Sequence, residues 1–290
     1  MKLQHLNKKR LILIDLDGTA LRKDGQTIHK KTLEVLKKAS SEGHTVCIIT
    51  GRPHRATMRF YKQLGLTSLM TNFDGAHIHD PYKRRFKRVV LPISEQVVFE
   101  IINNPIIKQY VTNILIESYN KAFVMKKDEF IENFFHLDDV DDDEYFIADP
   151  YENWEGPATN LCLFVSNEDE KDIITRQLEK FKNTVKIQSG NVYGNLSNSS
   201  TLMITLTSKI VNKGFVARIL AQYYNKDIRD VIAFGDQMND YEMIKQVGYG
   251  VAMKNGTTDL KNVADGITNL TNDEGGLGEY LERLLNGEEV

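Results

Sequence analysis

The feature that most constrains this chain is a short apolar run that ends in two aspartates. Residues 11–14 are all apolar, and they lead directly into Asp15-Leu16-Asp17-Gly18-Thr19. A short apolar run that is closed by a turn signal predicts a buried strand. Open α/β sheets bind their ligands at the carboxyl ends of the strands. We therefore expect Asp15 at that edge, and Gly18 allows a turn that brings both acids toward one site.

An Asp-x-Asp-Gly sequence has three physical uses. Its carboxylates can bind a hard cation through oxygen. One carboxylate can attack phosphorus while the other handles a proton. Both can also be solvated turn residues, which is the usual role of Asp beside Gly. An EF-hand loop is excluded, because its sixth position requires glycine and holds Ala20 here.

Composition limits the classes of protein to which the chain can belong. Its 290 residues are 41% hydrophobic, which is enough for a buried core and two domains. The net charge of −3 provides no global field for nucleic acid or membrane partners. Cys47 and Cys162 lie in apolar runs, and we expect buried, inert thiols that suit a reducing compartment. Since no apolar stretch approaches a transmembrane length, we expect a soluble cytoplasmic protein.

Strand and helix patterns alternate at both ends of the chain. The first part predicts elements over residues 11–14, 27–41, 45–49, 53–64 and 66–71. The last part predicts elements over residues 213–224, 231–234, 250–253 and 277–285. Such alternation predicts a parallel α/β sheet. We therefore predict a Rossmann-like core domain formed by residues 1–81 and 209–290, with an inserted α/β (α+β) cap domain over residues 82–208.

The middle third has a different texture. We expect a helix capped by Ser94, a hairpin, two further strands and an amphipathic helix, the last four over residues 113–125, 160–165, 185–188 and 169–181. The basic residues within 83–88 could draw in anionic substrates, but we interpret them and the acidic run 138–144 as solvated surface. Residues 195–200 are a polar connection rich in Ser and Asn. His77 and His79 alternate like strand residues, and we expect structural or cap-facing roles for them.

Polar turns follow three strands of the predicted core. They are the Asp15 turn, Thr50-Gly51, and the stretch from Asp236 to Asp240, while Lys213 begins a helix nearby. These positions share one edge of a parallel sheet. A cluster of carboxylates is costly, and a divalent cation with oxygen ligands, Mg²⁺, relieves the cost. The cation, the ammonium group and the threonine hydroxyl would favour a phosphate between them.

The order of these motifs resembles that of the haloacid dehalogenase superfamily. Asp-x-Asp-Gly-Thr is followed by Thr-Gly-Arg, Asn-Lys-Gly and Gly-Asp-x-x-Asn-Asp. The insertion between the second and third motifs is similar to the α/β cap of the Cof-type subfamily, subclass IIB. The resemblance covers essentially the whole chain, and it implies a phosphatase in which an aspartate carries the phosphoryl group.

The resemblance also implies residue roles. Asp15 would be the nucleophile, and Asp17 would be the general acid and then the general base. The Asp15 carboxylate, the Asp17 main-chain carbonyl and Asp236 would bind Mg²⁺. Phosphate oxygens would be held by the Leu16 amide, Thr50, the Gly51 amide, Lys213 and Asn239.

Three further residues stand beside this set. Asp240 would anchor Lys213 rather than touch the metal, and Arg52 would support the phosphate loop or pair with an acid. Asp74-Gly75-Ala76 stands where the family commonly has Asn-Gly-Ala. An ionised Asp cannot donate a hydrogen bond, and it would disfavour highly anionic substrates unless it is paired.

The sequence therefore predicts an Mg²⁺-dependent phosphatase of small phosphorylated metabolites, similar to sugar phosphates, with a cap that closes over the site. A phosphomutase or phosphotransferase would share the aspartyl-phosphate and differ in the acceptor. A non-enzymatic phospho-acceptor protein fits less well. Such a protein needs neither an acid that protonates a leaving group, as Asp17 would, nor a large cap. A dehalogenase or a silent metabolite-binding protein also fits the motifs less well. The sequence ranks no particular substrate and no oligomeric state.

Overall fold

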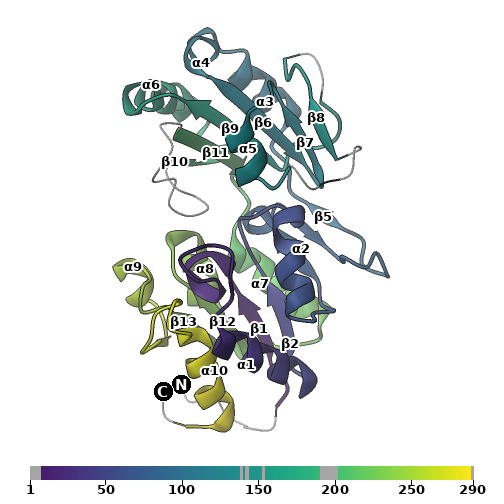
Figure 1. Ribbon diagram of the computed structural model, residues 1–290, viewed down its shortest axis with the longest axis vertical. Helices are drawn as coiled ribbons and strands as arrows, with labels where there is room; N and C mark the ends of the chain where they lie inside the picture. Colours follow the sequence, from purple (N-terminus) through teal and green to yellow (C-terminus); the bar gives the residue numbers. More distant parts are fainter. Residues whose placement is uncertain (1–7, 138–139, 141–143, 152–153, 190–201, 289–290) are drawn as a thin grey trace. The chain divides into compact units, whose positions relative to one another are not determined.

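The computed structural model describes residues 8–137, 140, 144–151, 154–189 and 202–288, and it contains two compact units (Figure 1). Unit 1 comprises residues 1–50, 59–88 and 212–290, and unit 2 comprises residues 51–58 and 89–211. The sequence predicts that residues 51–58 belong to the core domain. In the structure, the contacts of these residues group them with unit 2. Those domain bounds stay a prediction.

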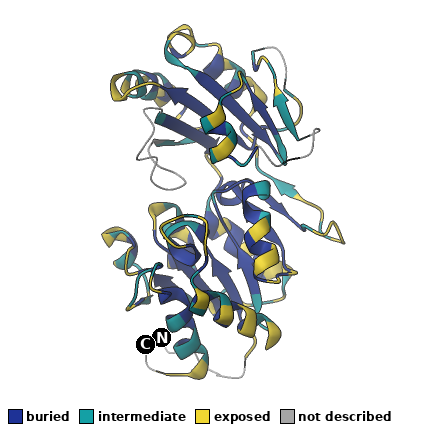
Figure 2. Ribbon diagram, in the orientation of Figure 1, coloured by how far each residue is buried: buried dark blue, intermediate teal, exposed yellow. Residues whose placement is uncertain are grey.

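A five-stranded parallel sheet forms the centre of unit 1. Its order is β14-β13-β12-β1-β2, and the strands are β1 (Leu11–Ile14), β2 (Thr45–Ile48), β12 (Val231–Gly235), β13 (Tyr249–Ala252) and β14 (Gly266–Ile267). All four residues of β1 are buried, as a central strand of a parallel sheet requires (Figure 2). The predicted Rossmann-like α/β core is therefore confirmed.

Helices alternate with these strands. They are α1 (Lys30–Ser41), α2 (His54–Gln63), α7 (Lys213–Tyr223), α8 (Tyr241–Gln246), α9 (Thr258–Lys261) and α10 (Gly276–Asn286). Helix α1 packs against α10, and α7 packs against α8. Right-handed crossovers through α1 and α8 run in opposite directions along the sheet, so these two helices cover opposite faces. Among the described residues, no helix is long and apolar enough to cross a membrane.

The strand order reverses between β1 and β12. The chain passes from β1 to β2 on one side and from β12 to β13 on the other. Ligands of open α/β sheets bind at such a switch point, outside the carboxyl ends of the strands. The residues that follow β1 and β12 are therefore the first place to look for a functional site.

The expected strand at residues 66–71 does not extend the parallel sheet. Strand β3 (Met70–Asn72) pairs antiparallel with β4 (His77–His79), and one parallel bridge, Ile49 to Thr71, links it to the end of β2. The chain reverses in a 3₁₀ turn over residues 73–75, which brings β4 back alongside β3. The rings of His77 and His79 stack with centroids 4.2 Å apart inside this ribbon.

Unit 2 is built on a six-stranded sheet. Its order is β10-β11-β9-β6-β7-β8, and the strands are β6 (Asn113–Ser118), β7 (Lys121–Val124), β8 (Tyr145–Ile147), β9 (Asn160–Val165), β10 (Val185–Ser189) and β11 (Leu202–Ser208). Neighbouring strands are antiparallel except β7 and β8, which are parallel. The short strand β5 (Val89–Val90) begins the main segment of this unit.

Alternate residues of β6 enter different hydrophobic clusters on the two faces of this sheet. Ile114 and Ile116 pack with residues of α3 (Glu95–Ile102), α4 (Pro105–Tyr110) and α6 (Glu168–Leu178). Leu115 packs with Ile131 from α5 (Glu129–Phe134). The period of two explains why the strand is buried along its whole length.

The sequence predictions for unit 2 are partly right. The predicted hairpin is present as β6 and β7, and the predicted strands and amphipathic helix correspond to β9, β10 and α6. Ser94 precedes α3, but its side chain makes no capping hydrogen bond. The prediction missed α4, α5, β5, β8 and β11. Residues 195–200, and residues 138–144 apart from 140 and 144, lie outside the described residues.

Candidate active site

Asp15 is the first residue after β1, and it faces a buried lysine. Its main-chain amide donates to the carbonyl of Phe234, which extends the pairing of β1 with β12 by one residue. Its carboxylate oxygen Oδ1 accepts a hydrogen bond from Lys213 Nζ at 2.7 Å. Asp15 is therefore fixed both by the sheet and by an ion pair at the switch point.

The turn over Leu16–Ala20 depends on Gly18. Gly18 has φ +73°, and a Cβ atom there would lie 2.1 Å from Asp236 Oδ2. Thr19 Oγ1 donates to Asp236 Oδ1 at 3.0 Å, so the turn after β1 is bonded to the end of β12. Asp17 is half-buried in this turn. Close approach and backbone angle both explain why glycine stands at this position.

Lys213 is the first residue of α7 and is fully buried. The preceding Asn212 caps the helix, because its side chain accepts from the amide of Phe215 at 2.7 Å. The lysine Nζ lies 2.7 Å from Asp15 Oδ1, 2.6 Å from Asp240 Oδ1 and 3.5 Å from Asp74 Oδ1. One ammonium group thus joins carboxylates from three distant parts of the sequence.

Asp236 and Asp240 come from the turn after β12, and they are held differently. Asp240 Oδ2 accepts from the main-chain amides of Asp236 and Gln237 at 2.9 and 3.2 Å, while its Oδ1 accepts from Lys213. Asp236 accepts from Thr19 and, through Oδ2, from Gln237 Nε2 at 3.3 Å. Asp240 therefore anchors the lysine and the turn, as the sequence predicts.

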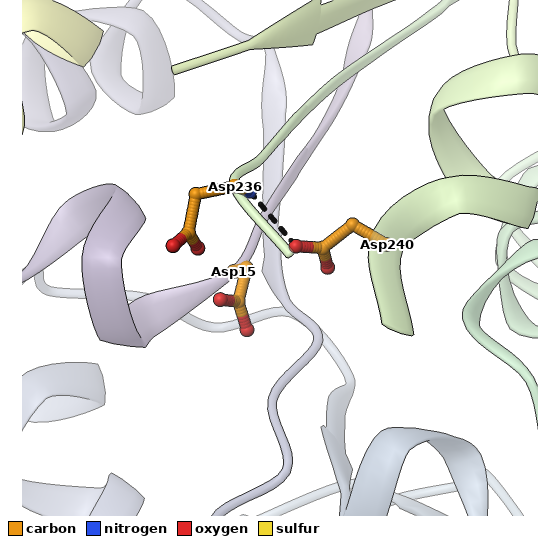
Figure 3. Close-up of side chains that lie close together, drawn as sticks. All are labelled: Asp15, Asp236 and Asp240. Atoms are coloured by element: carbon orange, nitrogen blue, oxygen red, sulfur yellow. Dashed lines mark hydrogen bonds between the residues drawn. The ribbon is translucent and has the colours of Figure 1, made fainter. Parts of the chain in front are cut away.

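Asp15, Asp236 and Asp240 form an acidic cluster that could hold a cation (Figure 3). One ligand oxygen of each lies within 4.8 Å of the others. Asp240 accepts from the lysine and from two main-chain amides, whereas Asp236 accepts only from side chains that can rotate away. Asp15 and Asp236 are therefore the better candidates for metal ligands. Carboxylate oxygens are the donors that Mg²⁺ prefers, so the residues present fit this ion.

The electrostatics of the cluster show an excess of negative charge. Burial raises the pKa of Asp15 well above its ordinary value; Lys213 opposes the shift, and Asp240 and Asp236 add to it. Burial, followed by repulsion from Asp240, raises the pKa of Asp236 to about 7. Burial by itself lowers the pKa of Lys213, but Asp15, Asp240 and Asp74 outweigh it and the pKa lies above its ordinary value. A bound cation would relieve this imbalance.

Two of the predicted phosphate-binding residues lie beside the turn at Asp74. Thr50 is buried, and its carbonyl accepts from the amide of Asp74 at 2.9 Å. Asn239 Nδ2 donates to Asp74 Oδ1 at 3.0 Å. Leu16 is buried next to Asp15. Gly51 and Arg52 belong to unit 2, and their approach to this cluster stays a prediction.

Sequence reasoning did not assign some residues of this site. Asp74 was recognised only as a departure from a family motif, yet its carboxylate contacts Lys213 and Asn239. The Asp74 carboxylate is therefore paired. Because it is paired, it need not repel an anionic substrate. Thr19 was part of the first motif but received no role. Asn255, whose Nδ2 donates to the carbonyl of Gly18 at 2.7 Å, also has no role in the sequence-based prediction.

Comparison with known proteins identifies the family. The model of the haloacid dehalogenase-like hydrolases matches residues 12–281. The chain belongs to this family. A putative phosphatase of Metamycoplasma hominis is 30% identical over 277 residues, which are 95% of this chain and 96% of the relative. The 5-amino-6-(5-phospho-D-ribitylamino)uracil phosphatase YitU of Bacillus subtilis is 30% identical over 279 residues, 96% of this chain and 98% of the relative.

Two solved structures share the fold of this chain over nearly its whole length. A Thermotoga maritima protein has a TM-score of 0.78 at 25% identity, covering 95% of this chain and 97% of that one. A subclass IIB sugar phosphatase has a TM-score of 0.70 at 18% identity, covering 95% and 98%. The predicted membership of the haloacid dehalogenase superfamily and the predicted phosphatase-class enzyme are confirmed.

Proposed function

We propose that this protein hydrolyses small phosphate monoesters through a phosphoryl group carried on Asp15, with Mg²⁺ as its cofactor. The observation that carries the proposal is the placement of Asp15 on Lys213, which Asp240 holds from the other side. This arrangement orients a buried carboxylate and gives it a counter-charge, which opposes the rise in the pKa of Asp15 that burial causes. Such a carboxylate is suited to act as a nucleophile.

The reaction would proceed in two balanced steps. A carboxylate oxygen of Asp15 forms a bond to phosphorus while the bond from phosphorus to the leaving oxygen breaks, and Asp17 gives its proton to that oxygen. A water molecule then attacks the phosphorus of the aspartyl-phosphate, Asp17 takes its proton, and phosphate leaves with Asp15 restored. Throughout both steps, Lys213 Nζ would offset the negative charge that gathers on Asp15 and the phosphoryl group.

The chain offers a ligand set for the cation and a separate set for the phosphate. Asp15, Asp236 and the main-chain carbonyl of Asp17 would hold Mg²⁺, which supplies positive charge beside the phosphoryl oxygens when bound. Thr50, Asn239 and the amides of residues 16 and 51 would donate to the phosphate oxygens, with Arg52 in support. Donors fixed before the substrate arrives need no reorganisation during the reaction.

The substrate class that we propose is a sugar or sugar-alcohol phosphate. Several Bacillus subtilis relatives are named for a substrate whose phosphate sits on a ribityl chain, and one structural neighbour is named a sugar phosphatase. We propose a cytosolic location, since Cys47 and Cys162 are both buried free thiols.

The decisive experiment compares Asp15→Asn with the wild type and with Asp259→Asn, the same change at an exposed aspartate of α9. We expect Asp15→Asn to abolish phosphate release from an aryl phosphate and from a panel of sugar phosphates, with its melting temperature largely kept. Asp259→Asn should behave like the wild type. Substantial turnover by Asp15→Asn would refute the covalent mechanism, and transfer to an added sugar instead of water would indicate a phosphotransferase.

A further inference from the structure

The turn between β3 and β4 is strained. Phe73, Asp74 and Gly75 have φ angles of +51°, +54° and +118°, so three successive residues adopt positive values. A positive φ is uncommon for Asp and a genuine outlier for a bulky aromatic residue such as Phe. Strain of this kind persists only where the surroundings enforce it, and it is concentrated at functional sites. The turn is therefore a candidate for a functional role.

The strained turn delivers the carboxylate of Asp74 to the phosphate-binding residues. Asp74 is only 4% exposed, and its amide donates to the carbonyl of Thr50 at 2.9 Å. Its Oδ1 accepts from Asn239 Nδ2 at 3.0 Å and lies 3.5 Å from Lys213 Nζ. Asp74 Oδ1 thus lies close to both Asn239 and Lys213, two side chains that are proposed to contact the phosphate.

This contact determines which end of the Asn239 amide is available. An asparagine side chain has a donating NH₂ end and an accepting carbonyl end, whereas an ionised carboxylate only accepts. Asp74 can therefore hold Asn239 only by its Nδ2. A flipped amide would place two acceptor oxygens against each other, which is repulsive. Nδ2 has two hydrogens, so one can bond to Asp74 while the other remains for a phosphate oxygen.

We propose that Asp74 is a positioning residue for the phosphate site. Its carboxylate selects the orientation of Asn239 that presents a hydrogen-bond donor to the substrate. The inference rests on the proposed function above. It also assigns a role to the position at which the chain departs from the Asn-Gly-Ala pattern, since an asparagine there could bond to either end of the Asn239 amide.

The test is a double-mutant cycle between Asp74 and Asn239. We choose Asp74→Gly because glycine adopts φ +54° without strain, so the variant is expected to fold. The measured quantities are kcat/KM for an aryl phosphate and the inhibition constant of inorganic phosphate. Asp74→Gly and Asn239→Ala should each raise that inhibition constant about tenfold, as the loss of a charge-assisted hydrogen bond implies. The double variant should be no worse than either single variant.

The conservative variant separates positioning from packing. Asp74→Asn keeps an acceptor for Asn239, so its inhibition constant should lie between those of the wild type and Asp74→Gly. Three results would overturn the inference. The inhibition constant of phosphate could rise in the double variant by the product of the two single effects, or it could be unchanged in Asp74→Gly. It could also be higher in Asp74→Asn than in Asp74→Gly. A wild type that neither hydrolyses aryl phosphate nor binds phosphate would instead refute the proposed function.

Discussion

A buried ion pair in unit 2 leads to the most quantitative prediction. Arg55 Nη1 donates to Glu117 Oε2 at 2.9 Å, Nη2 donates to Oε1, and Nε donates to the carbonyl of Phe135. The side chains of Arg55 and Glu117 are 6% and 0% exposed. Arg55 follows Arg52 by three residues, so the pair bonds the segment that carries part of the predicted phosphate loop to β6.

We predict that Glu117→Gln destabilises unit 2 by about 3 kcal/mol, because it leaves the guanidinium buried without a counter-charge. The substitution nearly conserves volume, so little of the loss comes from a cavity. With a urea m-value of about 2 kcal/mol/M, the unfolding midpoint would fall by about 1.5 M. Replacing both partners, with Arg55→Met and Glu117→Leu, should recover most of the stability, since a buried pair gains little over an apolar one.

The chain contains a single tryptophan, Trp154, whose ring lies 4.6 Å from that of Phe99 inside unit 2. Its fluorescence therefore reports the unfolding of this unit alone. Glu179→Gln is the matched control, because Glu179 pairs with Lys182 at the surface and such pairs contribute little. A Glu117→Gln midpoint that matches the control would refute the stabilising role of the buried pair.

Two more changes test the site in unit 1. Gly18→Ala should lose most of its kcat/KM, because an alanine Cβ would collide with the Asp236 carboxylate. It should lose only about 1–2 kcal/mol of stability, the cost of a positive φ at alanine. A kcat/KM within twofold of the wild type would contradict this prediction. Mg²⁺ at about 100 times its Kd should stabilise the protein by about 2.7 kcal/mol and raise its melting temperature. Asp236→Asn should abolish that rise and Asp259→Asn should keep it; an equal rise in both variants contradicts the metal assignment.

The sequence predicts well those features that local patterns determine. The run before Asp15 is apolar at every position and ends at a turn signal, so both β1 and the edge position of Asp15 could be read from it. Asn212 is a strong helix-capping residue, which agrees with the prediction that Lys213 begins a helix. Parallel topology then brings such ends together without any information on tertiary contacts.

The features that sequence reasoning missed depend on contacts between distant residues. Asp74-Gly75 is an ordinary turn sequence, and only the packing of Lys213 and Asn239 makes its carboxylate part of the site. Strand β3 is short, and the reversal at residues 73–75 decides that it pairs with β4. Strand β11 mixes threonines with apolar residues, so its burial between β9 and β10 is set by the sheet and not by its own composition.

The pairing of β1 with β12 has a consequence for biosynthesis. Leu11 pairs with Val231, so one neighbour of the central strand is translated long after the strand itself. At about 5–20 residues per second, β1 leaves the ribosome roughly ten to forty seconds before that neighbour exists. The six strands of the unit 2 sheet are translated in the meantime, and they pair only with one another. Unit 2 can therefore fold first. During this interval the apolar β1 has an open edge that chaperones would need to shield.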